Sequence, residues 1–136
     1  MLVREWISPS EGQGWFYQCL QETLCPFQWH YHPEFELTLT LHARGVRYIG
    51  SDIDLFGEID LALVAPGQPH TWQASPPEDG QTHQVQVVLF RQEWLDRLAG
   101  GGLPELRALR SWMASLRSGV VFSQAQAMQM RPAVAE

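Results

Sequence analysis

The chain has 136 residues, 45% of them hydrophobic, so it is about the size of one domain with a core of its own. Its formal net charge is −6, whereas a domain that itself binds DNA or RNA is usually basic, so we expect no direct nucleic-acid contact. The polar N-terminus, the lack of an apolar run near the roughly 20 residues of a membrane helix, and a count of only two cysteines predict a soluble cytoplasmic protein with reduced thiols.

Short strands are expected through the first 90 residues. Residues 3–7 and 15–20 each fit a strand, and Pro26 breaks the chain before the next strand, which begins at Trp29. Farther on, apolar and polar side chains alternate. The apolar members of this alternation are Phe35, Leu37, Leu39 and Leu41. In a barrel, the polar face could line an inner pocket, and other elements or a partner chain would cover the apolar face.

More strands are expected between residues 44 and 90. A strand over 46–49 is predicted to return along the previous one through a hairpin at 44–46. Residues 52–54, with two aspartates, fit a solvated loop. A wholly apolar strand is expected over 61–65, and a last alternating strand begins at His83, which we expect to be a surface or strand-start residue.

Helices are expected after residue 90, where the period of the apolar residues changes. They are predicted over residues 94–98, from Pro104 to Gly119, and from a capping Ser123 onward with an interruption at Pro132. The second helix has an apolar stripe at spacings of three and four. Its members are Leu106, Leu109, Met113 and Leu116. This stripe is predicted to pack either on the barrel or on the same helix of a partner chain.

Histidines and a glutamate recur at a spacing that suits a metal site. His30, His32 and Glu36 form the pattern H-x-H-x-x-x-E, and on a single strand their even numbers would place them on one face. His70 follows the apolar strand and a stiff turn as a fourth candidate. Imidazoles and a carboxylate suit a divalent transition metal such as Zn, Ni, Mn or Fe. The alternative is that these side chains hydrogen-bond one another, or a ligand, without metal.

Four aromatic side chains are candidates for binding a small molecule: Trp15, Tyr17, Tyr48 and Trp72. The first two belong to an aromatic trio that would suit the rim of a pocket. Trp72 follows His70 by two residues and would face the same cavity on a strand. Packing within the sheets is an equally good interpretation of these side chains.

The pattern H-x-H-x-x-x-E followed by P-G-x-P-H resembles the two-motif signature of the cupin superfamily. More narrowly, WHYHPEFELTLTL and DLALVAPGQPHTW resemble the N-terminal sensor domain of AraC-type transcription regulators, over roughly residues 27–122. The resemblance implies an all-β dominated fold. Residues 1–90 would form a cupin double-stranded β-helix, or jelly-roll barrel, and residues 91–136 would form two or three C-terminal helices that serve as a dimerisation and linker region.

The resemblance also implies a function. The domain would bind a small-molecule effector, such as a sugar or a related polar ligand, and control DNA binding by a helix-turn-helix domain that these 136 residues do not contain. It would form a homodimer through its C-terminal helices and have no membrane partner. The chain would then be a fragment of a longer regulator.

The alternative is a stand-alone metal-dependent cupin enzyme, a dioxygenase or isomerase. Metal catalysis also needs an acid, base or redox partner near the ion. Only Glu34 and Tyr31 stand out near the histidines, and Glu34 fits equally well as a surface acid. We therefore expect a binding protein rather than an enzyme.

Overall fold

The computed structural model describes residues 2–5, 15–22, 28–74 and 83–135. Within these ranges the chain is dominated by β-structure, as predicted. The strands are β1 (Val3–Arg4), β2 (Trp15–Glu22), β3 (His30–Tyr31), β4 (Phe35–Leu41), β5 (Gly45–Ile49), β6 (Asp52–Phe56), β7 (Ile59–Val64), β8 (His70–Ala74), β9 (His83–Phe90) and β10 (Gly119–Val121). The helices are α1 (Gln92–Ala99), α2 (Pro104–Ala114) and α3 (Gln124–Ala135).

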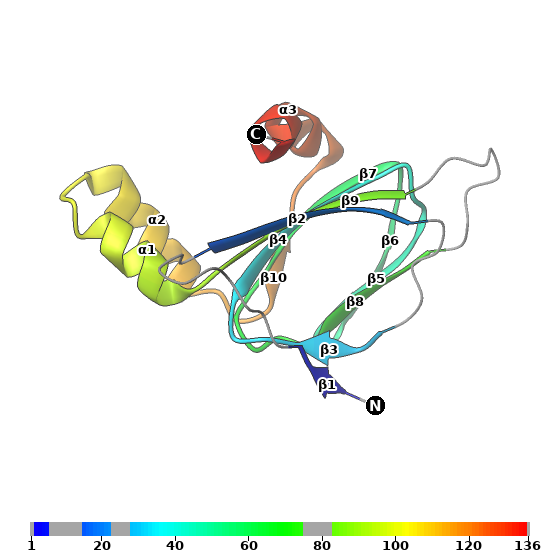
Figure 1. The fold of residues 1–136 in the computed structure, drawn as a ribbon, viewed down its shortest axis with the longest axis horizontal. Coiled ribbons are helices and arrows are strands. Elements are labelled where there is room, and N and C mark those ends of the chain that lie inside the picture. The colour runs from blue at the N-terminus through cyan, green and yellow to red at the C-terminus, as the bar shows by residue number, and fades with distance from the viewer. Residues whose placement is uncertain (1, 6–14, 23–27, 75–82, 136) are drawn as a thin grey trace.

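The strands form two five-stranded sheets that face each other (Figure 1). The first sheet has the order β1-β3-β8-β5-β6, and the second has the order β10-β7-β4-β9-β2. Neighbouring strands are antiparallel except β1 and β3. Among the described strands no hydrogen-bonded pairing joins one sheet to the other, so this part of the chain is not a closed barrel.

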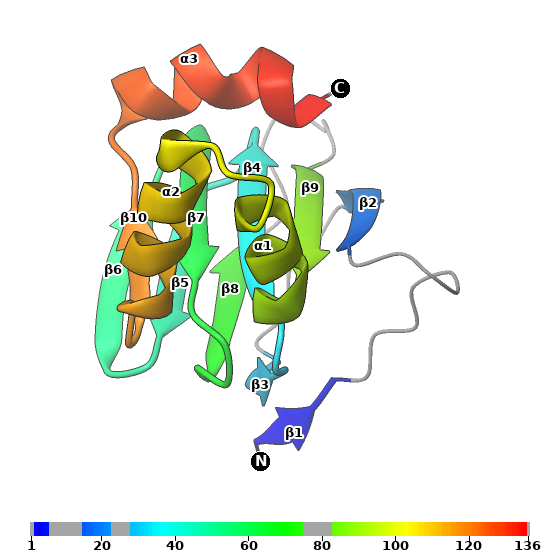
Figure 2. The ribbon, with the colours of Figure 1, turned by 90° about the vertical axis from the view of Figure 1, so that its left-hand side faces the viewer.

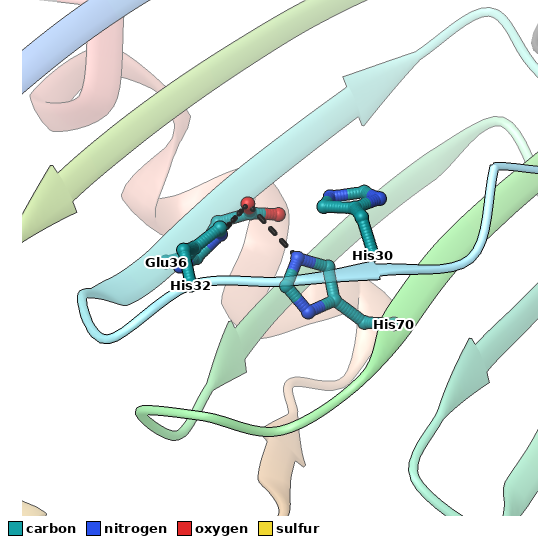
Figure 3. Close-up of side chains that lie close together, drawn as sticks. All are labelled: His30, His32, Glu36 and His70. Carbon is teal, nitrogen blue, oxygen red and sulfur yellow. Dashed lines mark hydrogen bonds and ion pairs between the residues drawn. The ribbon is translucent and has the colours of Figure 1, made fainter. Parts of the chain in front are cut away.

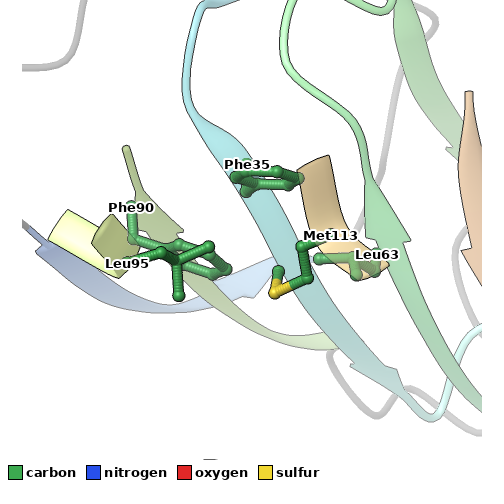
Figure 4. Close-up of a cluster of buried hydrophobic side chains, with 5 residues drawn as sticks. All are labelled: Phe35, Leu63, Phe90, Leu95 and Met113. Atoms are coloured by element: carbon green, nitrogen blue, oxygen red, sulfur yellow. The ribbon is translucent and has the colours of Figure 1, made fainter. Parts of the chain in front are cut away.

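The apolar face of β4 points away from the facing sheet and is covered by the helices of the same chain. Phe35 and Leu63 pack with Leu95 of α1 and Met113 of α2 (Figure 4). Farther along β4, a second apolar cluster contains Ala127 of α3. Figure 2 shows α1 and α2 side by side over this sheet and α3 across one end of it. The sequence left open whether other elements of the chain or a partner chain would cover this face, and the chain's own helices cover it.

The opposite face of β4 is polar and lies between the sheets, where polar groups must find partners. Deep in this layer, Asp60 of β7 accepts a bond of 2.8 Å from Nη1 of Arg47 and one of 3.1 Å from Nε1 of Trp72. Burial raises the pKa of Asp60, and the bonds and charge of Trp72 and Arg47 oppose this shift without cancelling it. Because Asp60 belongs to one sheet and its two donors to the other, this network ties the sheets together.

The predicted strand from residue 29 through residue 41 is wrong as a single element. β3 ends at Tyr31 and β4 begins at Phe35 in the other sheet, with Pro33 between them. The predicted hairpin at 44–46 is also wrong, because β5 pairs with β6 and β8 and not with β4. Gly45 makes the pairing with β8 possible, since a Cβ there would overlap the backbone carbonyl of Gln73.

Two further local predictions are corrected by pairings between distant segments. Residues 52–54 are exposed, as expected, but they form part of edge strand β6 and not a loop. The second helix ends at Ala114, and Gly119 instead begins β10, which pairs with β7. A Cβ at Gly119 would lie 2.7 Å from the carbonyl oxygen of Leu63, so only glycine allows the two strands to approach this closely.

The start of α3 is as predicted. Ser123 Oγ accepts a hydrogen bond from the backbone N–H of Gln126, whose side chain in turn accepts one from the backbone N–H of Ser123. Pro132 lies inside the helix. In the described part of the chain, no helix is long and apolar enough to cross a membrane.

The helix-covered face of β4 should carry much of the stability. Leu39 is fully buried in it, so Leu39→Ala is expected to lower the free energy of unfolding by about 2–5 kcal/mol, because it removes apolar contacts and leaves a cavity. Urea denaturation measures this loss. The matched control is Leu55→Ala on β6, where the side chain is 76% exposed and the change should stay within about 0.5 kcal/mol. Equal losses in the two variants would contradict this account of the core.

Candidate metal centre

The four predicted ligands come together where the two sheets meet (Figure 3). His30 of β3 and His70 of β8 are register partners in one sheet, and Glu36 projects from β4 of the other. His32 lies in the short connection between β3 and β4. Each residue offers one ligand atom, and these atoms all lie within 4.8 Å of one another. The predicted convergence is therefore correct, although it is reached from two sheets and not from the face of one strand.

The Glu36 carboxylate is the centre of this cluster. Its Oε1 lies 3.0 Å from Nε2 of His32 and 3.2 Å from Nε2 of His70, and its Oε2 accepts a hydrogen bond of 2.7 Å from the Thr38 hydroxyl. Glu36, His32 and His70 are buried, whereas His30 is partly exposed. Glu36 is thus held in one orientation, with a single oxygen presented to two imidazoles.

The other ring nitrogen of each histidine faces a backbone carbonyl. Nδ1 lies 2.6 Å from the Gln28 oxygen in His30, 3.1 Å from the Glu34 oxygen in His32, and 2.7 Å from the Gln68 oxygen in His70. A carbonyl oxygen only accepts hydrogen bonds, so each Nδ1 must carry the hydrogen. A neutral imidazole has one ring hydrogen, so in the neutral rings each Nε2 has a free lone pair.

Each of these Nε2 atoms faces a carboxylate oxygen. Those of His32 and His70 face Glu36, and that of His30 lies 3.3 Å from Oε2 of Glu5. Two acceptors at this separation repel each other unless a proton or a metal cation lies between them. Glu5 carries no signal in the sequence pattern. It reaches His30 because its backbone N–H bonds to the Tyr31 carbonyl, which extends the parallel pairing of β1 with β3.

The electrostatics of the cluster favour a negative Glu36 beside positive charge. Burial by itself would raise the pKa of Glu36, but the hydrogen bonds and charges of His32 and His70 outweigh it and hold this pKa well below its usual range. Burial by itself would lower the pKa of His32, but the hydrogen bond and charge of Glu36 outweigh it, so this pKa is raised. Both shifts have the same cause, since a negative Glu36 and a positively charged His32 stabilise each other.

The structure brings only one of the four aromatic candidates to this centre. Trp72 shares the inner face of its sheet with His70, and their ring centroids are 6.0 Å apart. The strand register places Trp15 and Tyr17 on the helix side of their sheet. Tyr48 lies on the outer face of the other sheet. A ligand role for these three residues remains a prediction, at a distance from the four-residue cluster.

Glu34 and Tyr31 do not reach the inner side of the cluster. Tyr31 alternates with His30 on β3 and so points to the other face. Glu34 is buried and is not the surface acid that its place beside Pro33 suggested. Its carboxylate approaches Nδ1 of His32, at 3.9 Å, while Glu36 is bonded to Nε2. His83 begins β9 as expected, but it is buried and not on the surface.

The metal-free protein should lose stability above neutral pH. The pKa of His32 is raised in the folded state, so its contribution is fully present below the unfolded value of about 6.5 and is lost as pH rises through the folded value. The pKa of Glu36 is lowered, so its contribution is present above about pH 4.3 and is lost as pH falls toward the folded value. Urea denaturation of wild-type protein in chelator should therefore show a free energy of unfolding that declines above about pH 6.5. This decline should be absent in His32→Gln. If the free energies of unfolding of wild type and His32→Gln change with pH in parallel, the His32–Glu36 contact does not cause the decline.

Comparisons with models of protein families, with curated proteins and with solved structures find no match for this chain. Its function is therefore inferred from the chemistry of the four-residue cluster.

Proposed function

We propose that this chain is a metal-binding sensor domain of cupin type, in which His30, His32, Glu36 and His70 hold a divalent transition metal and a small polar effector binds beside it. One observation carries the metal assignment: three Nδ1 atoms are committed to backbone carbonyls, so three Nε2 lone pairs face carboxylate oxygens. In metal sites the second nitrogen of a ligating histidine almost always bonds in this way, which fixes the ring and its tautomer.

Protons satisfy the same cluster less well than a metal does. One proton would leave either His32 or His70 with a lone pair against Glu36 Oε1. Two protons would leave a net positive charge in a buried site without any coordination bond, and burying unbalanced charge is costly. A divalent cation also leaves a net charge of about +1, but it forms direct bonds to every ligand atom at once.

The ligand types and spacings narrow the choice of ion. Calcium and magnesium prefer oxygen ligands, whereas imidazole nitrogens with one carboxylate suit Zn, Ni, Mn or Fe. Bonds of about 2.1 Å place neighbouring ligand atoms about 3.0–3.4 Å apart in octahedral or tetrahedral geometry. The two Nε2–Oε1 separations, 3.0 Å and 3.2 Å, already fall in this range. The remaining pairs lie within 4.8 Å, which small side-chain rotations would reduce.

Sensing is favoured over catalysis because neither of the two acid–base candidates from the sequence, Glu34 and Tyr31, is aimed at the ion position. Glu34 approaches Nδ1 of His32, on the side of the ring away from the cluster, and Tyr31 lies on the other face of its strand. The residual positive charge would attract an anionic or diol-bearing effector such as a sugar or sugar acid, and Trp72 offers an aromatic ring beside His70.

A cavity of about 220 Å³ near the centre has the character of a site for a small polar molecule. It opens between edge strands β6 and β10. Ile49, one of its walls, is the register partner of His70 on the neighbouring strand. Buried Arg47 also lines it, together with Asp52 and Asp54 of β6. A charged and apolar lining of this kind suits a small polar molecule, which would bind one strand away from the four-residue cluster, since none of those four residues lines the cavity.

The helices offer a route by which an effector would act on a partner. Four large apolar side chains on α1, α2 and their connection are exposed: Leu98, Leu103, Leu109 and Trp112. Their burial would support a homodimer, and a DNA-binding domain outside these residues would complete an AraC-type regulator. Regulation then requires that the effector bind two dimer arrangements with different affinity.

Elemental analysis tests the metal assignment directly. Protein purified without a metal-affinity column is expected to carry about one equivalent of Zn, Ni, Mn or Fe, and a His32→Ala, His70→Ala double variant should carry none. Metal at 100 times its Kd should also raise the free energy of unfolding by about 2.7 kcal/mol. The control is His42→Asn, because His42 is an exposed histidine outside the cluster, and asparagine tolerates its positive φ of 62°. A wild-type protein that takes up none of the four metals would overturn the proposal.

Loaded protein that turns over candidate sugars or sugar acids would move the function to the enzyme alternative. Binding of such a molecule without turnover supports the sensor.

The dimer is tested separately by sedimentation equilibrium. Wild-type protein is expected to sediment as a dimer, and Leu109→Glu with Trp112→Glu should sediment as a monomer, because two charges would then lie in the buried contact. Leu55→Glu on β6, a still more exposed apolar position outside the helices, serves as the control and should remain dimeric. A monomeric wild type would rule out the helical dimer and leave the metal assignment unaffected.

A further inference from the structure

Glu34 combines deep burial with an incomplete set of hydrogen bonds. Its side chain is 6% exposed, and its Oε2 accepts a bond of 3.3 Å from Nε of Arg91. Its Oε1 is buried without a hydrogen-bond partner among the described residues. A buried carboxylate oxygen without a donor is costly and calls for an explanation. The ion pair with Arg91 does not explain the burial, because the Arg91 side chain is 55% exposed and ion pairs with exposed partners contribute little to stability.

The unpartnered oxygen lies behind a predicted metal ligand. Glu34 Oε1 is 3.9 Å from Nδ1 of His32, and the backbone oxygen of Glu34 accepts the Nδ1 hydrogen at 3.1 Å. On the other side of the same ring, Nε2 lies 3.0 Å from Glu36. His32 is therefore flanked by two buried carboxylates, one at each ring nitrogen. A cation bound at Nε2 withdraws electron density from the ring and strengthens Nδ1–H as a donor.

We propose that Glu34 is a positioning residue of the metal centre. Its carboxylate stabilises the orientation of the His32 ring and the partial positive charge that this ring gains when Nε2 binds a metal. Arg91, the residue that precedes the first turn of α1, holds Glu34 in place. The chain of contacts from His32 through Glu34 to Arg91 thereby connects the centre to the start of the helical region. This inference rests on the proposed metal site, which its test must therefore examine in the same samples.

Glu34→Gln is the informative variant, because it keeps the shape and removes the charge. Zn²⁺ affinity is measured by competition with a chromophoric chelator, and ligand geometry by the visible absorption spectrum of the Co²⁺-loaded protein. We expect one bound metal per chain, a Zn²⁺ affinity about 10–100-fold weaker, and an altered Co²⁺ spectrum. The stability of the metal-free variant should be unchanged or higher, because an incompletely bonded buried charge has been removed.

Two further variants separate this role from a general effect of charge. Glu58→Gln removes an exposed carboxylate that pairs with Arg44 at 3.3 Å, so it is the matched control and should change neither affinity nor spectrum. Arg91→Gln should weaken Zn²⁺ binding less than Glu34→Gln does. The double variant should be no weaker than Glu34→Gln alone, since Arg91 acts through Glu34.

Three results would overturn the inference. Wild-type affinity and spectrum in Glu34→Gln would show that Glu34 does not position His32, while the metal centre itself would stand. A loss of metal-free stability with an unchanged Co²⁺ spectrum would reduce Glu34 to a structural residue. If the wild-type chain binds neither Zn²⁺ nor Co²⁺, the metal centre is wrong and the role of Glu34 is overturned with it.

Discussion

The contact between one oxygen of Glu36 and the imidazoles of His32 and His70 is the interaction on which the centre depends. It joins the two sheets, because Glu36 belongs to β4 and His70 to β8. The contact is also electrostatically incomplete, since the backbone carbonyls behind the rings leave their Nε2 atoms as acceptors in the neutral state. A proton or a cation between these atoms would complete the contact.

The two faces of β4 explain how the protein can contain this arrangement and remain stable. Its apolar face is buried under α1, α2 and α3, and that burial offsets the cost of placing charged and polar side chains on the inner face. The inner polar groups are organised into two linked sets. One surrounds Glu36, and the other joins Asp60 to Arg47 and Trp72. Trp72 contacts His70, so the two sets meet at the edge of the centre.

Local patterns in the sequence were enough to predict some of these features. Alternation over residues 35–41 follows directly from the period of a strand, and Met113 lies on its helix's apolar stripe because the period there is 3.6. The four cluster residues were also predicted together from their types, although the single strand face on which that prediction placed three of them was wrong. What was not predictable depends on which distant strands pair. Examples are the crossing between sheets near Pro33, the short strand that begins at Gly119, and the outward placement of Tyr17.

The burial of Glu34 is another feature that local sequence patterns do not predict. A carboxylate beside a proline has no local periodic signal, and the side chain that donates a hydrogen bond to it, Arg91, lies 57 residues farther along the chain. Sequence patterns report the period of one element, whereas partners at this separation are fixed only when the whole sandwich assembles.

The placement of the ligands on both sheets has a mechanical consequence. Glu36 and His70 are 34 residues apart in the chain and lie on opposite layers of the sandwich. An ion held between them would act as a removable cross-link, so any fluctuation that parts the layers would have to break coordination bonds. His30, His32 and Glu36 are near neighbours in the sequence, so an unfolded chain would keep these three close together and lose only the fourth member of the cluster, His70. Metal occupancy would then determine how often the two sheets separate transiently.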